Sequence, residues 1–267
     1  MKFVRFSLDR QTSSTATDAV TGVRWGLVED DKYCQVTGSP FGQWIATSRF
    51  YSPGEVRLLP PCSPSKIVCI GRNYAEHAKE LSNPLPAEPL LFLKPPSSLI
   101  ASGDEILYPP QSERVDYEGE LGLVMGRRCS QITDPAEALE CAFGYTCVND
   151  VTARDLQKRD VQFTRGKGFD TFCAVGPCLV PREELEASQL SVRTWLDGEL
   201  KQDGNTRDLI FPLGVIISYI SQVMTLEPGD LIATGTPAGV GPMRPGSTVT
   251  VAVEAIGELR NAVRRRQ

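Results

Sequence analysis

The sequence predicts a mainly β fold with a few short helices, divided into a small N-terminal unit and a larger domain. Short apolar runs bounded by turn residues recur along the chain, whereas stretches with helical periodicity are few and do not alternate regularly with the strands. A proline-rich segment, Leu59–Pro64, separates two parts of different character, because proline favours extended chain and excludes helix. We therefore expect a small β unit at residues 1–60 and the main domain at residues 61–267.

The composition is that of an ordinary globular protein, and it argues against several kinds of partner. The chain has 267 residues and a net charge of −5, which disfavours binding to nucleic acid. No apolar run reaches the roughly 18 residues that a transmembrane helix needs, and charges interrupt the start where a signal peptide would be apolar. We therefore expect a cytoplasmic protein with no membrane partner. The eight cysteines form no Cys-x-x-Cys pair, so we interpret them as small buried hydrophobic residues.

Local patterns predict the elements in chain order. In the N-terminal unit, Lys2–Phe6 and Val23–Val28 read as short strands, and Thr37–Pro40 contains turn residues. In the main domain, short apolar runs predict strands and longer periodic stretches predict helices. The segment Arg165–Asp170, which contains two glycines, is expected to be a flexible loop. The expected strands are 66–70, 89–94, 117–124, 142–150, 190–196, 229–234 and 247–253, and the expected helices are 75–81, 135–141, 152–158 and 214–224.

Two glutamates in the strand at 117–124 point to a metal site. Glu118 and Glu120 are two residues apart, so on a strand both side chains lie on the same face. Carboxylates this close repel each other, and burying them is costly without a compensating cation. Asp150 ends the next strand and can supply a third carboxylate, and three such ligands suit Mg²⁺ or Mn²⁺ while leaving positions for water and substrate. The alternative is a solvent-facing edge strand without an ion.

Two further features predict catalytic groups. His77 is the only histidine and lies three residues before Glu80, so both side chains occupy one face of the predicted helix. A carboxylate beside an imidazole orients it and raises its basicity, which makes the pair a candidate general base that activates water. Lys167, between two glycines, can hold a substrate carboxylate or stabilise an enolate. The alternatives are an exposed helix pair and an ordinary surface lysine.

Other residues near strand ends predict where the substrate binds. Arg72 and Lys94 each lie at a strand end, where open sheets tend to place sites, and each can hold an anion. Thr236 can offer its hydroxyl and neighbouring backbone N–H groups to an oxyanion. The glycine-rich run 235–241 lacks the Gly-Lys-Ser/Thr ending of a phosphate-binding loop, and no helix with a ribose-binding acid follows it. We therefore expect no nucleotide site there.

Six motifs follow one another within residues 66–257: Gly71–His77, Phe92–Pro95, Asp116–Leu121, Asn149–Asp155, Lys167–Asp170 and Thr234–Val240. In this order they resemble the fumarylacetoacetate hydrolase family. The resemblance implies a mixed β-sandwich roll, usually a homodimer, and the short N-terminal β appendage resembles that of bacterial members.

The resemblance also implies roles for individual residues. The three carboxylates named above would bind Mg²⁺ or Mn²⁺. His77 and Glu80 would form the water-activating pair, on a segment that orders as a lid over bound ligand. Lys167 would contact the substrate, and Gln157 and Thr236 would also face it.

We expect a divalent-metal-dependent hydrolase or decarboxylase that acts on a small 2-oxo acid, such as an acylpyruvate or oxaloacetate, through an enolate that the metal ion stabilises. The His–Glu pair favours hydrolysis or decarboxylation. One alternative is an isomerase or keto–enol tautomerase of 2-hydroxydienoate diacids or of oxaloacetate, in which only a proton moves. Another is a family member that binds its ligand without turnover.

Overall fold

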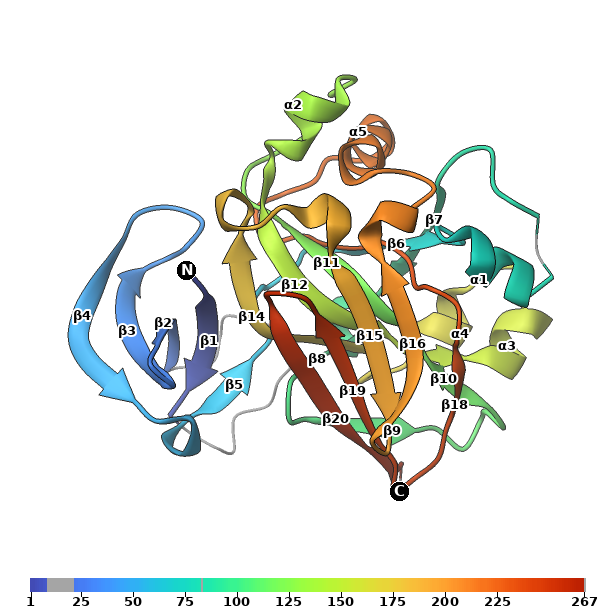
Figure 1. The fold of residues 1–267 in the computed structure, drawn as a ribbon, viewed down its shortest axis with the longest axis horizontal. Helices are drawn as coiled ribbons and strands as arrows, with labels where there is room; N and C mark the ends of the chain where they lie inside the picture. Colours follow the sequence, from blue (N-terminus) through green and yellow to red (C-terminus); the bar gives the residue numbers. More distant parts are fainter. Residues whose placement is uncertain (9–21, 83, 267) are drawn as a thin grey trace.

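The computed structural model describes residues 1–8, 22–82 and 84–266. Within these residues the protein is mainly β, with short helices around extensive sheets, which confirms the predicted fold class. Figure 1 shows the N-terminal strands on one side of the molecule and the rolled sheets of the main domain on the other. None of the described helices is long and apolar enough to cross a membrane.

The largest sheet runs through both parts of the chain. Its strands lie in the order β4-β3-β2-β1-β14-β12-β11-β17-β6-β7, with β5 also paired to β1 and β8 to β14. Most neighbours are antiparallel, whereas β17 with β6 and β14 with β8 are parallel. The strands of this sheet are β1 (Phe3–Ser7), β2 (Val23–Glu29), β3 (Lys32–Gly38), β4 (Trp44–Tyr51), β5 (Arg57–Leu59), β6 (Ile67–Gly71), β7 (Leu90–Lys94), β8 (Leu99–Ala101), β11 (Gly119–Met125), β12 (Ala142–Asp150), β14 (Cys173–Pro181) and β17 (Leu231–Ala233).

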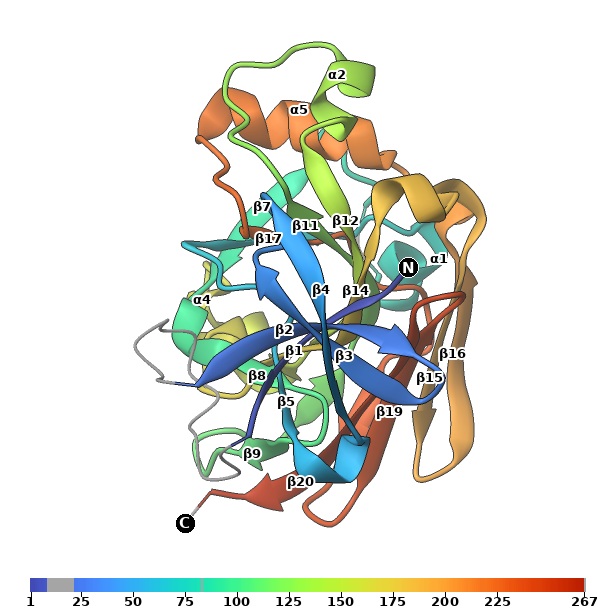
Figure 2. The ribbon, with the colours of Figure 1, turned by 90° about the vertical axis from the view of Figure 1, so that its left-hand side faces the viewer.

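The N-terminal strands hold together partly through aromatic contacts. Phe3 packs edge-on against Trp44 with 5.3 Å between ring centroids, and Phe6 lies 5.4 Å from Tyr51. The residue pair Phe3–Leu179 joins β1 to β14. In Figure 2 these strands face the viewer, in front of the main domain. The predicted division after residue 60 falls between β5 and β6 and stays a prediction.

Two smaller sheets complete the main domain. The five-stranded sheet β16-β15-β19-β20-β9 packs against β11, β12 and β14 of the large sheet, and much of the apolar core lies between these two layers. A three-stranded sheet, β13-β10-β18, lies beside the short helices α3 and α4. The strands are β9 (Glu105–Tyr108), β10 (Val115–Tyr117), β13 (Thr152–Ala153), β15 (Ser191–Leu196), β16 (Glu199–Asn205), β18 (Gly241–Met243), β19 (Thr248–Val253) and β20 (Gly257–Arg265).

The helices are short and lie at two places on the surface of the roll. Helices α2 and α5 pack on each other at one end, and α1, α3 and α4 gather along one side (Figure 1). Their bounds are α1 (Ala75–Glu80), α2 (Pro135–Leu139), α3 (Arg154–Arg159), α4 (Thr164–Lys167) and α5 (Leu213–Val223), and 3-10 turns occupy Pro53–Glu55, Pro96–Ser98, Arg182–Glu184, Ala187–Gln189 and Thr206–Asp208.

Two predicted elements are interrupted or shortened by contacts with distant segments. The strand expected at 117–124 is split at Glu118, whose N–H donates to the side-chain oxygen of Asn149 at 3.0 Å instead of to a neighbouring strand. The helix expected at 152–158 begins at Arg154, because residues 152–153 pair with β10 as the strand β13. Both differences arise from contacts with segments that are distant in sequence.

The prediction of a flexible loop at 165–170 was wrong for residues 165–167, because Lys167 is the last residue of helix α4, whereas residues 168–170 lie outside any helix or strand. Its N–H donates to the carbonyl of Phe163 at 2.9 Å. A Cβ on Gly166 would lie 2.9 Å from the backbone nitrogen of Gln157, so the glycine allows α4 to pack closely on α3. Glycine is needed at position 166 for close packing of α4 on α3, and this packing fixes the position of Lys167.

The eight cysteines are all buried free thiols, which confirms their interpretation as small core residues. Burial raises the pKa of Cys62 to about 12 and that of Cys178 to about 11. Such thiols stay protonated near neutral pH and pack as hydrophobes.

A buried carboxylate fastens the proline-rich linker to the main domain. Asp230, at the start of β17, is fully buried and accepts hydrogen bonds from the N–H groups of Ser65, Lys66 and Glu227 at 2.8 to 3.1 Å. The Ser65 hydroxyl donates to it at 2.7 Å, and the Lys66 ammonium supplies the counter-charge. These bonds fix where the chain enters β6.

We expect Asp230→Ala to lower the free energy of unfolding by about 3 kcal/mol, since it leaves several part-buried donors and the Lys66 ammonium without their acceptor. Urea denaturation measures the change. The control is Asp203→Ala, whose ion pair with Arg193 is about half exposed and screened by solvent, so its loss should be much smaller. Equal losses in the two variants would contradict the role given to Asp230.

Candidate active site

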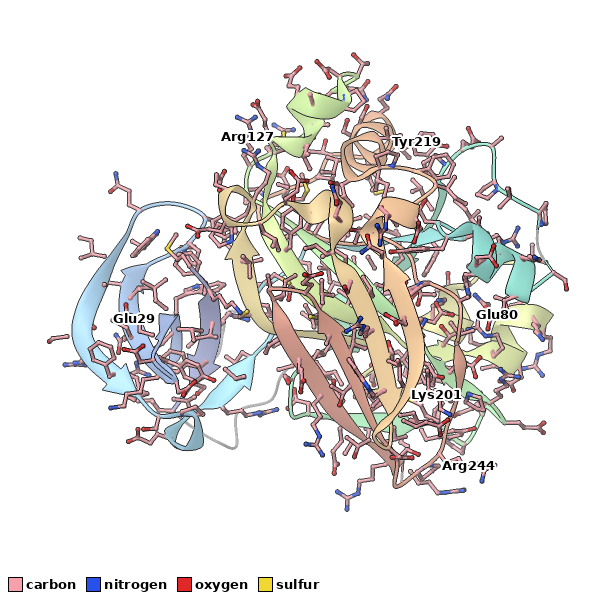
Figure 3. All side chains as sticks on the ribbon, in the orientation of Figure 1. Glu29, Glu80, Arg127, Lys201, Tyr219 and Arg244 are labelled. Atoms are coloured by element: carbon pink, nitrogen blue, oxygen red, sulfur yellow. The ribbon has the colours of Figure 1, made fainter. Side chains whose placement is uncertain are left out.

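A cavity of about 310 Å³ lies where β6, β7, β11 and β12 meet the helices α1, α3 and α4. Eight of the ten predicted site residues line it, and the other two, Glu80 and Lys94, are each bonded to a lining residue. Figure 3 shows Glu80 on this side of the molecule, close to α3 and α4. The lining residues are Ile70, Gly71, Arg72, His77, Leu81, Phe92, Glu118, Glu120, Asp150, Arg154, Gln157, Lys158, Phe163, Lys167 and Thr236.

Three carboxylates meet at the bottom of the site. Glu118 lies between β10 and β11, Glu120 lies on β11, and Asp150 ends the antiparallel neighbour β12. Oxygen atoms of the three side chains lie within 4.8 Å of one another, and all three residues are buried. The sequence predicted this cluster, although the strand carrying the two glutamates is interrupted.

Cations from three different elements surround two of these carboxylates. Lys167 Nζ donates to Glu118 Oε2 at 2.7 Å and to Asp150 Oδ2 at 2.6 Å. Lys94 Nζ donates to Asp150 Oδ1 at 2.6 Å, and the guanidinium of Arg154 bonds to Glu118. Burial alone would favour the neutral acid, but Lys167 and Arg154 outweigh it and hold the pKa of Glu118 well below its ordinary value. Glu118 is therefore a carboxylate at neutral pH.

Glu120 is the carboxylate without a cationic partner in the described part of the chain. It accepts a hydrogen bond from the Gly235 N–H at 2.8 Å. Burial, followed by repulsion from Asp150 and Glu118, raises the pKa of Glu120 well above its ordinary value. The three cations Lys94, Lys167 and Arg154 match the three carboxylates in number, but all of their ion pairs go to Glu118 and Asp150. A divalent ion held by the three carboxylates would give Glu120 the cationic partner that it lacks, and an all-oxygen donor set suits Mg²⁺ or Mn²⁺.

His77, on α1, lines the cavity, and Glu80 supports it from outside the lining. His77 Nδ1 lies 3.3 Å from Glu80 Oε2, and the imidazole is almost fully buried. The backbone N–H of Gly239 also donates to Glu80, at 3.1 Å to Oε1 and 3.3 Å to Oε2. The carboxylate is held from two sides, so it can orient the imidazole toward the cavity.

The predicted substrate-binding residues divide into two groups. Arg72, Gln157 and Thr236 line the cavity, and the arginine has a left-handed backbone with a φ of 59°. Lys94 does not line it: its ammonium is buried behind Asp150, and it also donates to the carbonyl of Val151 at 3.1 Å. This placement favours a role for Lys94 in holding Asp150 over direct contact with a substrate.

Two residues that complete the site were not predicted. Arg154 bridges Glu118 to the buried Asp116, with 2.9 Å between Nε and the aspartate oxygen. It falls inside the Asn149–Asp155 motif, one signal that could have identified it. Gln202, on β16, accepts from the Gly119 N–H at 2.9 Å and donates to Thr236 Oγ1 at 2.8 Å. It lies in no motif, so local sequence carries no signal for it.

The chain belongs to the fumarylacetoacetate hydrolase family. The family model described as "Fumarylacetoacetate (FAA) hydrolase C-terminal" matches residues 66–264, and the model "Rv2993c-like, N-terminal" matches residues 1–61. Protein Rv2993c of Mycobacterium tuberculosis is 45% identical over 233 residues, which is 87% of this chain and 88% of that protein. Oxaloacetate tautomerase YisK of Bacillus subtilis is 42% identical over 229 residues, covering 81% of this chain and 76% of the relative.

Solved structures agree with this membership. The 2-hydroxyhepta-2,4-diene-1,7-dioate isomerase from Mycobacterium marinum has a TM-score of 0.87 and 40% identity, covering 100% of this chain and 99% of that one. The fumarylpyruvate hydrolase from Pseudomonas aeruginosa, solved with Mn²⁺ and pyruvate, has a TM-score of 0.73 and 32% identity, covering 79% of this chain and 92% of that one.

We expect Glu120→Gln to abolish stabilisation by divalent ions. In the wild type, Mg²⁺ or Mn²⁺ at about 100 times its Kd should raise the free energy of unfolding by about 2.7 kcal/mol. The variant should show no such rise, yet in EDTA it should be at least as stable as the wild type, because glutamine removes the repulsion from Asp150 and Glu118. Thermal denaturation with and without metal measures both effects.

The matched control is Glu137→Gln, a substitution at an exposed glutamate on α2. It should keep the full response to the metal. A response that survives in Glu120→Gln would exclude Glu120 as a ligand.

Proposed function

We propose that this protein is a divalent-metal-dependent keto–enol tautomerase or isomerase of small 2-oxo diacids, of which oxaloacetate is the simplest. The observation that carries the proposal is that the buried triad Glu118–Glu120–Asp150 and the imidazole of His77 face the same cavity. Moving a proton beside a 2-oxo group needs both a site for the oxyanion and a proton carrier. The names of the more similar relatives support this alternative better than the hydrolase or decarboxylase that the His–Glu pair alone suggested.

The cavity suits a short anionic substrate. Its volume of about 310 Å³ is small. The cations Lys167 and Arg154 are occupied by carboxylates of the protein, whereas Arg72 and Lys158 line the cavity without an ion pair in the described residues. We assign Arg72, supported by Lys158, to the distal carboxylate of the diacid. Gln157 would face the bound molecule, since it lines the same wall.

Residues of this chain divide the work of proton transfer. Burial alone would lower the pKa of Lys167, but Asp150 and Glu118 outweigh it and raise that pKa above its ordinary value, so the side chain stays an ammonium. Lys167 is then a fixed positive charge and not a base. His77, oriented by Glu80, is the group that carries the proton between the enol oxygen and the neighbouring carbon. When bound, a divalent ion would supply Lewis-acid stabilisation of the developing negative charge.

A cleaving reaction is the second candidate. The same His–Glu pair can activate water, and the Pseudomonas aeruginosa relative is named a fumarylpyruvate hydrolase. Binding without turnover would leave the hydrogen-bonded pair of His77 and Glu80 without a function. Product analysis separates the three functions.

The first experiment follows oxaloacetate with Mg²⁺ or EDTA by enol absorbance and by release of pyruvate. We expect metal-dependent loss of enol absorbance without pyruvate. His77→Ala should slow this reaction by about 100-fold or more, because it removes the proton carrier, while its thermal stabilisation by Mg²⁺ stays that of the wild type.

Pyruvate that forms as fast as the enol disappears would instead identify a decarboxylase. Metal-dependent release of pyruvate and an acid from acetylpyruvate or fumarylpyruvate would identify a hydrolase. Stabilisation by oxalate and Mg²⁺ without any product would support binding alone.

We expect Arg72→Ala to raise the KM for oxaloacetate by about 10- to 100-fold, the range for a lost charge-assisted hydrogen bond. Inhibition by pyruvate, which lacks the distal carboxylate, should change by less than about 3-fold, because the remaining contacts are kept. Arg244→Ala, at an exposed arginine labelled in Figure 3, is the control and should change neither constant. Equal losses for the diacid and the monoacid would contradict the assignment to the distal carboxylate.

A further inference from the structure

Tyr117 stands next to the first carboxylate of the triad but is not part of the cavity wall. It is the last residue of β10 and is buried. Its hydroxyl donates to the carbonyl oxygen of Gly239 at 2.9 Å, across the loop that connects β17 to β18. The strand β10, which leads into Glu118, is therefore tied directly to this loop.

The same glycine contacts the catalytic pair. The N–H of Gly239 donates to both carboxylate oxygens of Glu80, and Glu80 Oε2 lies 3.3 Å from His77 Nδ1. A continuous chain of hydrogen bonds thus runs from Tyr117 through Gly239 and Glu80 to the imidazole. It links β10 to helix α1, whose His77 lines the cavity.

The geometry at Gly239 leaves little freedom for another arrangement. Its φ is +102°, and a Cβ there would lie 2.1 Å from the carbonyl oxygen of Lys201, so only glycine fits between the loop and β16. The start of the loop is fastened separately, because Gln202 Nε2 donates to Thr236 Oγ1 and to the carbonyl of Pro237, each at 2.8 Å. The end of the loop is held by β10 in two ways: the Tyr117 hydroxyl bonds to Gly239, and β18 begins at Gly241 by pairing with Tyr117 through the backbone.

We propose that Tyr117 is a positioning residue: its hydroxyl holds Gly239 in the orientation from which the glycine N–H fixes Glu80, and Glu80 in turn directs His77 into the cavity. The importance of this chain for turnover rests on the proposed function. Its effect on His77 does not, because the contacts exist whatever the reaction is. Helix α1 has only six residues, too few to hold its own side chains in place, so it needs an external anchor.

Tyr117→Phe tests the proposal, because it removes the hydroxyl and keeps the ring in place. His77 is the only histidine, so its side-chain ¹⁵N and ¹H resonances give one unambiguous NMR signal set. We expect these resonances to shift and broaden in Tyr117→Phe, and to change in the same direction in Glu80→Gln. Tyr145→Phe, at another buried tyrosine on β12, is the matched control and should leave them unchanged. Unaltered His77 resonances in a folded Tyr117→Phe protein would overturn the proposal.

Kinetics on oxaloacetate supply the second readout. Tyr117→Phe should lower kcat by about 10- to 100-fold through misplacement of the imidazole, with KM and stabilisation by Mg²⁺ within about 2-fold of the wild type. In a Glu80→Gln background the same substitution should have no further effect, since it acts through Glu80. Losses that multiply in the double variant would overturn the proposal. If the wild type does not turn over oxaloacetate, the proposed function fails, and the NMR comparison still decides the role of Tyr117.

Discussion

The burial of three mutually repelling carboxylates is the constraint on which the rest of the site depends. Their oxygens lie within 4.8 Å of one another in an interior where unbalanced charge is costly. Lys94 comes from β7, Arg154 from α3 and Lys167 from α4, so each counter-charge draws a different element toward the cluster. Helices of four and six residues have little stability of their own, and ion pairs to the triad help to keep α4 and α3 folded where a substrate meets them. The ion pairs that balance the charge of the triad thus also hold the helices that shape the cavity.

Local pattern in the sequence was enough to predict the residues whose role follows from nearby spacing. Glu118 and Glu120 were predicted together from a two-residue separation, and the structure keeps them together although Asn149 interrupts the strand between them. That interruption could not be predicted, because it depends on a side chain 31 residues away. Gln202 is the clearest case: it fastens the Thr236 loop to the triad strand from 83 residues away, and nothing beside it in the sequence marks it.

The fold shows the same division. The strands expected at 190–196 and 247–253 correspond closely to β15 and β19, and β19 shows strict alternation of buried valines with partly exposed residues. The strands β16 and β20 were missed because polar residues occupy inward positions, such as the buried Asn261, whose amide donates to two backbone carbonyls. The sequence predicts a loop in place of helix α4 because glycines flank Lys167, whereas in the structure Gly166 permits close packing of α4 on α3. The type of reaction was the hardest property to predict from the sequence, because the same His–Glu pair can move a proton or activate water. The names of the more similar relatives favour one of these reactions.

The burial of every native thiol has a consequence for how the site can be studied. All eight cysteines are packed in the interior, where a thiol is a poor nucleophile toward an added reagent. The native cysteines of the folded protein should therefore react poorly with maleimides, so they need not be removed. A single cysteine introduced at an exposed position of α1, such as Lys79, would be the preferred point of attachment for a fluorophore or spin label. A label at this position would report on the motion of α1, the helix whose His77 lines the cavity.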